Sequence, residues 1–298
     1  MVDIGIEKRL TIIEFLVSFV KQRFVWHKLC PLLIRCFIVI LACVVWLFPI
    51  YWLFVTAFKN ESDIGAIPPV WLFEPTLDHW KTVLYDWHML RYLKNSLVIS
   101  IVSTVLTVFF GTMAAYSLSR FSMRGKQVIA LEILSIRMIP PIVTAIPIFL
   151  LAREIGLYNT NQLVIMLYVL FNLPFVIWVM KGFLDEVPIE IEEAARVDGC
   201  GPMGIFLRIV LPIATPGLAC VSIFTFILCW NEFLFSNILL AGDNRTVPVI
   251  AALALKPRGI LWGPASAAAL GTMIPVIILA LFLQRWIVRG LSLGAVKE

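Results

Sequence analysis

The sequence contains few charged residues, and this scarcity limits its structural class. Only 14% of the 298 residues are charged, whereas 61% are hydrophobic and the mean hydropathy is +0.95. A soluble domain is about half apolar and about a quarter charged. The composition therefore excludes an ordinary soluble protein and predicts a membrane protein. The net charge of +5 reflects membrane topology and gives no reason to expect nucleic acid as a partner.

Cysteine pairs with the spacing of a disulfide framework, a metal site or a redox motif are missing. The six cysteines fall in or beside apolar segments, or in a stretch predicted to be cytoplasmic, where disulfides rarely persist. No two of them form a C-x-x-C pair. We interpret them as small apolar residues: Cys30, Cys36, Cys43, Cys200, Cys220 and Cys229.

Motifs for nucleotide binding and catalysis are also lacking. Gly125-Lys126 has neither the earlier glycine nor the following Ser or Thr of a phosphate loop. Ser292 lies in a formal G-x-S-x-G match, but every histidine precedes it, whereas the hydrolase order places the histidine later. We therefore predict no catalytic residue, no metal site and no cofactor on this chain, which would not itself be an enzyme.

Six apolar blocks are each long enough to cross a bilayer as a helix, which takes roughly 20 residues. They predict an all-α polytopic protein whose spans are Ile34–Phe58, Asn95–Ser119, Gln127–Ala152, Asn161–Gly182, Ile213–Leu240 and Pro264–Arg289. The corresponding domain boundaries are a tail at 1–33, a permease-like membrane domain at 34–289 and a tail at 290–298. The start contains an amphipathic pattern over Leu10–Val20, which predicts a helix on the membrane surface; the alternative is a disordered tail.

Orientation follows from the basic residues. With the N-terminus inside, the predicted cytoplasmic segments hold about twice as many Lys and Arg residues as the external ones, as the positive-inside rule requires. We therefore expect a multi-pass membrane protein with both termini in the cytoplasm.

The cytoplasmic stretch 183–212 is too polar to cross the membrane, yet its pattern is typical of a short helix–turn–helix. Pro188 suits the start of a helix, and the acidic residues around it suit the positive end of the helix dipole. Gly199 or Gly201 can supply the left-handed residue that ends it. A second short helix is predicted near Pro202. Two adjacent alanines give the first helix a slim face, which would fit a groove on another protein.

This stretch carries a family motif. Glu193-Ala194-Ala195, followed at fixed spacing by Gly199, Ile209 and Leu211-Pro212, resembles the EAA loop of ABC-importer permeases of type I. The chain from Ile34 onward is similar to the carbohydrate branch, specifically the smaller maltose-type permease subunit with six spans. Supporting segments are Asp198-Gly199, Arg137–Pro141, Trp230–Phe233 and Gln284–Gly290. The resemblance also implies that the membrane is the bacterial inner membrane.

The resemblance implies a mechanism and a set of partners. The EAA helix would dock into a cytoplasmic ATPase subunit, with Glu193 contacting its surface, and closure of two ATPase subunits on ATP and Mg would switch the access of the permease. Further partners would be a second, larger permease subunit and an external solute-binding protein. The coupling residues implied are Glu193, Ala194, Ala195, Asp198, Gly199, Ile209, Leu211 and Pro212.

Three polar residues within spans are candidates for the translocation path. Charges in the bilayer are costly, so Arg137 and Glu232 should face a cavity, a neighbouring subunit or each other. Asn231 would then line or gate the path beside Glu232. A purely structural polar contact explains these residues equally well.

Other functions remain as alternatives. A secondary transporter or channel would need no ATPase, but neither an inverted repeat nor several acidic residues within the spans are found. Within ABC importers, an amino-acid or peptide permease is the nearest alternative. A sugar, a polyol, a sugar acid or glycerol phosphate would all be compatible with the sequence.

Overall fold

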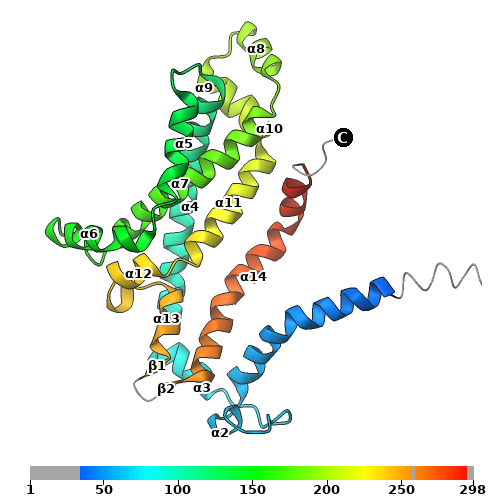
Figure 1. Ribbon diagram of the computed structural model, residues 1–298, viewed down its shortest axis with the longest axis vertical. Helices are drawn as coiled ribbons and strands as arrows, with labels where there is room; N and C mark the ends of the chain where they lie inside the picture. Colours follow the sequence, from blue (N-terminus) through cyan, green and yellow to red (C-terminus); the bar gives the residue numbers. More distant parts are fainter. Residues whose placement is uncertain (1–33, 257–258, 294–298) are drawn as a thin grey trace, which may run out of the picture. The chain divides into compact units, whose positions relative to one another are not determined.

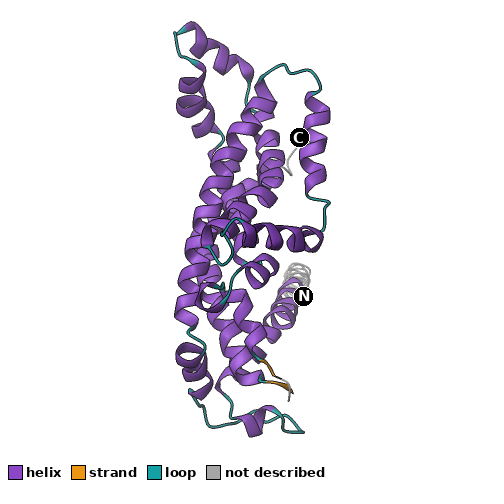
Figure 2. Cartoon of the chain, turned by 90° about the vertical axis from the view of Figure 1, so that its left-hand side faces the viewer, coloured by secondary structure: helices purple, strands orange, loops and turns teal. Residues whose placement is uncertain are grey.

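The computed structural model describes residues 34–256 and 259–293, which are almost entirely helical (Figures 1 and 2). The predicted all-α class is therefore confirmed. The chain divides into two units, up to Val55 and from Thr56 onward, and each is described by itself. The predicted amphipathic helix at Leu10–Val20 lies outside the described residues.

The described part of the first unit belongs to the helix Ile34–Phe58, which ends at Phe58, where the first span was predicted to end. Its mean hydropathy is 2.6, and only 6% of its most apolar window is buried. Large apolar side chains such as Phe37 and Trp46 are exposed along it. A helix of this length and surface suits one crossing of a lipid bilayer.

Three helices of the second unit are long and apolar enough to cross a membrane: α4 (Met89–Arg120), α7 (Asn161–Asp185) and α14 (Trp262–Leu293, judged on Trp262–Phe282). Two bent pairs also qualify if each is one span, so the described residues hold four to six candidate spans. Helix α14 continues past Arg289, so the predicted tail 290–298 begins inside a helix.

The two bent pairs cover the predicted third span and the start of the predicted fifth span. Helices α5 (Lys126–Ile136) and α6 (Pro141–Glu154) meet at 81°. Pro140 lies in the break, and Pro141 is the first residue of α6. Proline disfavours helical backbone at the residue before it, so the helix cannot continue through Pro140. The segment Pro202–Ile213 meets α11 (Thr215–Trp230) at 78°. The predicted fifth span therefore ends at Trp230 rather than Leu240, and α12 (Leu234–Leu239) follows separately.

Helix α4 is the centre of the second unit and packs most extensively against α7, then against α11. Its packing face is made of small residues, as close helix approach in membranes requires. At Gly111 an added Cβ would lie 2.6 Å from Cγ1 of Val176, so only glycine fits between α4 and α7 there. Ala115 is fully buried one turn further on.

Short elements connect these helices. They are α2 (Glu61–Ile64), α3 (Asp78–Lys81), the π-helices η1 (Thr82–Asp86) and η2 (Phe206–Val210), α8 (Ile189–Val197), α9 (Pro202–Ile205), α10 (Leu211–Ile213), the 3-10 helix η3 (Gly242–Asn244), α13 (Val247–Leu253) and the strands β1 (Leu255–Lys256) and β2 (Gly259–Ile260). The two strands pair antiparallel. Figure 1 shows α8 at one end of the second unit, with α3, β1 and β2 at the other.

Candidate partner-binding site

Helix α8 lies within the segment that carries the sequence motif. Pro188 precedes it and acidic residues occupy its first turn, as predicted. It ends in a Schellman motif: the N–H of Gly199 donates to the carbonyl of Arg196 (3.2 Å), and that of Cys200 to Ala195 (3.0 Å). Gly199 has a φ of +84°, whereas Gly201 has −72°, so Gly199 is the left-handed residue.

One face of α8 is unoccupied in this chain. Glu190, Glu193, Ala194 and Val197 are exposed, and their spacing of three and four residues places them on one side of the helix. The side chain of Val197 is 88% exposed. Glu192 and Ala195 lie on the opposite side and are buried. The helix therefore presents a small face that is both acidic and apolar.

The predicted coupling residues separate into two groups. Ala195 is buried, and Ile209 and Leu211 pack partly buried against the same core of α4, α7 and α11 side chains. These three hold the segment to the membrane helices. The remaining predicted residues are exposed and available to a partner: Glu193, Ala194, Asp198, Gly199 and Pro212.

The residues that fasten α8 to α4 were missed by sequence reasoning. Glu192 forms an ion pair with Arg120, the last residue of α4, and accepts a hydrogen bond from Tyr116 one turn earlier. The available signal was a basic residue at the end of a span near an acidic stretch. Nothing in the sequence singles out Glu192 from Glu190 and Glu193 beside it.

The candidate translocation residues do not gather at one place. Arg137 lies at the bend after α5, with its guanidinium 5.0 Å from the ring centre of Phe175. Glu232 instead accepts hydrogen bonds from the hydroxyl of Tyr168 (2.7 Å) and the N–H of Phe235 (2.9 Å), so it caps the start of α12. No ion pair joins Arg137 to Glu232 in the part of the chain that the structure describes.

Asn231 ends α11 and is exposed. Its side-chain amide donates to the carbonyl of Ile227 at 2.9 Å, within the same helix. A role of Asn231 or Glu232 in the translocation path therefore stays a prediction. The contacts of Glu232 define one role for it, which is to cap helix α12.

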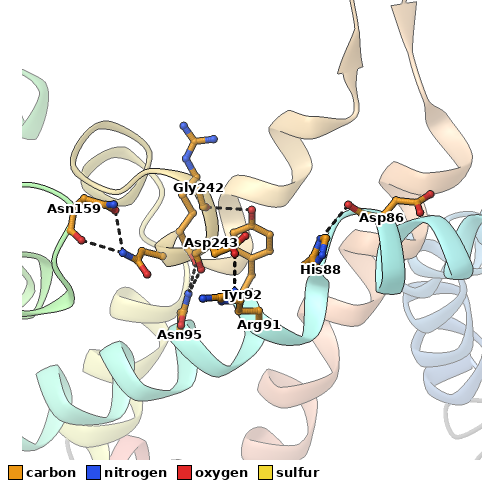
Figure 3. Close-up of polar contacts among 10 residues, drawn as sticks. Asp86, His88, Arg91, Tyr92, Asn95, Asn159, Gly242 and Asp243 are labelled. Carbon is orange, nitrogen blue, oxygen red and sulfur yellow. Dashed lines mark hydrogen bonds and ion pairs between the residues drawn. The ribbon is translucent and has the colours of Figure 1, made fainter.

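The opposite end of α4 holds a second loop, the segment 241–247. Arg91 pairs with the carboxylate of Asp243 (2.6 Å), and the amide of Asn95 donates to the carbonyls of Asp243 (2.7 Å) and Arg245 (3.1 Å). Figure 3 shows Arg91, Tyr92 and Asn95 facing this loop from one side of α4. We call this the Arg91 end of α4, and the end that contacts α8 the Arg120 end.

The fold of the chain is also found in a solved structure. A subunit of a bacterial ABC transporter that imports the acidic polysaccharide alginate has the same fold, with a TM-score of 0.69 and 21% sequence identity. The superposition covers 85% of this chain and 95% of that one.

Sequence comparison then gives the family. Residues 107–293 match the family described as the binding-protein-dependent transport system inner membrane component, and the chain belongs to it. It is 38% identical to a probable ABC transporter permease protein, y4oR, of Sinorhizobium fredii, over 85% of this chain and 91% of the relative. It is 35% identical to the trehalose/maltose transport system permease protein MalG of Thermococcus litoralis, over 87% and 94%. The predicted ABC permease is thereby confirmed.

Proposed function

We propose that this permease carries a carbohydrate or a related polyol into the cell. The support is the relative from Thermococcus litoralis, which is named for trehalose and maltose and matches along most of both chains. The amino-acid alternative finds no such support among the relatives described above.

We infer that the exposed face of α8 binds a cytoplasmic ATPase subunit. The observation that carries this proposal is the free face itself: Val197 is 88% exposed beside Glu193 and Ala194, while the other side of the same helix is buried. Ala194 and Val197 are adjacent on this face, and contiguous exposed apolar surface is typical of a protein interface. The small side chain of Ala194 allows close approach of a partner.

The remaining partners follow from this assignment. The α8 end faces the cytoplasm, and so do both termini, which agrees with the excess of basic residues in those segments. The opposite end, with α3, β1 and β2, faces the solute-binding protein. A second, larger permease subunit completes the translocation path, and ATP and Mg bind to the ATPase subunits rather than to this chain.

The experiment is to purify the tagged chain from its native membrane and identify the proteins that accompany it. Two charge-reversal variants show whether the ATPase subunit binds to α8. Glu193→Arg lies on the exposed face of α8, whereas Glu186→Arg is equally exposed but lies before the helix, at the end of α7. We expect an ATPase subunit and a second permease with the wild type and with Glu186→Arg, and loss of the ATPase subunit with Glu193→Arg.

A chain that purifies alone or paired only with itself would contradict the proposal that α8 binds an ATPase subunit. An ATPase subunit retained equally by both variants would show that it binds elsewhere than on α8. The carbohydrate is then sought by deleting the gene and testing growth on individual sugars and polyols.

A further inference from the structure

The last turn of α4 contacts helix α8 through a buried ion pair. Nε of Arg120 donates to Oε1 of Glu192 at 2.5 Å, and the two side chains are 10% and 1% exposed. The hydroxyl of Tyr116 donates to the other carboxylate oxygen, Oε2, at 2.9 Å. Both oxygens of Glu192 are therefore held by α4, which fixes the position and the rotation of α8 against it.

Two further contacts join α4 to the residues that precede α8. Arg120 also donates through its second terminal nitrogen to the carbonyl of Val187 at 2.8 Å. The hydroxyl of Ser119 donates to the carboxylate of Asp185 at 2.6 Å. Residues 185, 187 and 192 are thus all attached to two consecutive residues at the end of α4. The segment is tied to a helix from which it is separated by more than sixty positions in the sequence.

An arrangement of this kind is poorly explained by stability alone. Burying two charges costs several kcal/mol, and replacing such a pair with apolar residues is often neutral or stabilising. A guanidinium that donates to a carboxylate and to a carbonyl at once holds its partners in one geometry, which an apolar contact does not do. The pair therefore supplies a fixed geometry between α8 and α4.

We propose that Arg120 is a positioning residue, through which movement of α8 is passed to α4. This inference rests on the proposed binding of an ATPase subunit to α8. Helix α4 is an uninterrupted 32-residue helix whose other end holds the 241–247 loop, so a displacement at the Arg120 end reaches that loop through a rigid element. Without the ion pair, α8 would keep the hydrogen bond from Tyr116 and the buried contact of Ala195, but Arg120 would no longer fix the carboxylate of Glu192.

The test measures movement at the Arg91 end of α4 in the complete transporter complex. Leu90 lies in the first turn of α4 and is 66% exposed. A Leu90→Cys variant, in a chain whose native cysteines are replaced, is labelled with a maleimide with and without ATP plus orthovanadate. We expect ATP and vanadate to change the labelling rate, and Arg120→Gln to shrink that change at least about fivefold. ATP hydrolysis and the bound ATPase subunit should be retained.

Arg124→Gln is the matched control. Arg124 lies four residues after Arg120 and is exposed, so its replacement removes the same charge without touching Glu192. It should leave the ATP-dependent change in labelling as in the wild type. A merely structural role of Arg120 would lower the yield of the complex but not the response of the complexes that form.

Other outcomes decide the matter as follows. An unchanged response in Arg120→Gln overturns the inference and leaves the proposed function standing. The same conclusion follows if ATP does not change the labelling rate of Leu90→Cys in a complex that is otherwise wild type. Absence of an ATPase subunit from the wild-type complex instead refutes the proposed function. If Arg120→Gln fails to assemble, the apolar pair Arg120→Met with Glu192→Leu replaces it. That variant should assemble and lose the response, and a normal response in it overturns the inference.

Discussion

At its Arg120 end, α4 holds α8 through a buried ion pair, whereas at its Arg91 end it holds the 241–247 loop mainly through hydrogen bonds to backbone carbonyls. The ion pair at the Arg91 end is about half exposed, with side-chain exposures of 58% and 50% for Arg91 and Asp243. The pair between Arg120 and Glu192 is 10% and 1% exposed. The ion pair at one end of this helix is therefore buried, whereas the ion pair at the other end is exposed to solvent.

This difference matters because the energy of an ion pair depends on its burial. An exposed pair contributes about 0–1 kcal/mol, since water and salt screen it. Removing one partner of a buried pair costs about 3–5 kcal/mol, because the other charge is left without compensation. Loss of the ion pair at the Arg120 end should therefore cost much more than loss of the ion pair at the Arg91 end.

The largest effect is expected for Glu192→Ala, which leaves Arg120 buried without its partner. The complex should lose about 3–5 kcal/mol of stability, measured as a lower midpoint of thermal unfolding in detergent. Glu190→Ala on the same helix is exposed and should change stability by no more than about 0.5 kcal/mol. Equal shifts for the two variants would mean that the ion pair is not what fixes α8.

A second prediction concerns the end of α8. Gly199→Val places a β-branched residue at a φ of +84°, which costs about 1–2 kcal/mol and should displace the end of the helix. Gly201→Val is the control, because Gly201 has a φ of −72° and an added Cβ meets nothing within 4 Å at either position. Transport should be lost with Gly199→Val alone, with insertion into the membrane unchanged in both. Normal transport by Gly199→Val would refute the assignment of α8 as the coupling helix.

At the Arg91 end, Asn95→Ala removes both hydrogen bonds from Asn95 to the 241–247 loop and should cost about 1–2 kcal/mol. We expect faster hydrogen exchange in that loop, while the bound ATPase subunit is unaffected. Lys94→Ala changes an exposed neighbour and should leave exchange as in the wild type. A global loss of stability in Asn95→Ala would show that this attachment is no weaker than the one at Arg120.

The smallest effect is expected for Arg91→Gln. The pair with Asp243 is exposed, so its loss should change the opening of the loop by less than about 1 kcal/mol. The difference from the wild type should vanish at high salt, because screening already removes the attraction there. Hydrogen exchange at low and at high salt measures the size of the effect and its dependence on salt. A large effect that persists at high salt would contradict a weak, exposed ion pair at the Arg91 end.

Most of the fold could be predicted from the sequence because the membrane imposes simple rules. Long apolar blocks give spans, and the first helix ends at Phe58, as predicted. The sequence could not show how sharp the bends after α5 and before α11 would be, although Pro140 and Pro141 lie at one of them. Proline can either kink a continuing helix or end it, and the packing of neighbouring helices decides which occurs.

The exposed part of the site was predictable and its attachment was not. Motif spacing identified Gly199, and its positive φ confirms the predicted stop of the helix. The contact between Arg120 and Glu192 joins residues far apart in the chain, and only folding shows which of three neighbouring glutamates turns inward. The sequence likewise could not show that Glu232 would cap α12 rather than meet Arg137.

The most direct test of the account is photo-crosslinking from the two ends of the second unit. A photoreactive residue placed at Val197 on α8 should crosslink to an ATPase subunit in native membranes. The same residue at Leu72, which is 94% exposed and lies before α3, should not. Crosslinks to the ATPase subunit from Leu72, or none from Val197, would contradict the claim that the exposed face of α8 is where the permease meets its ATPase.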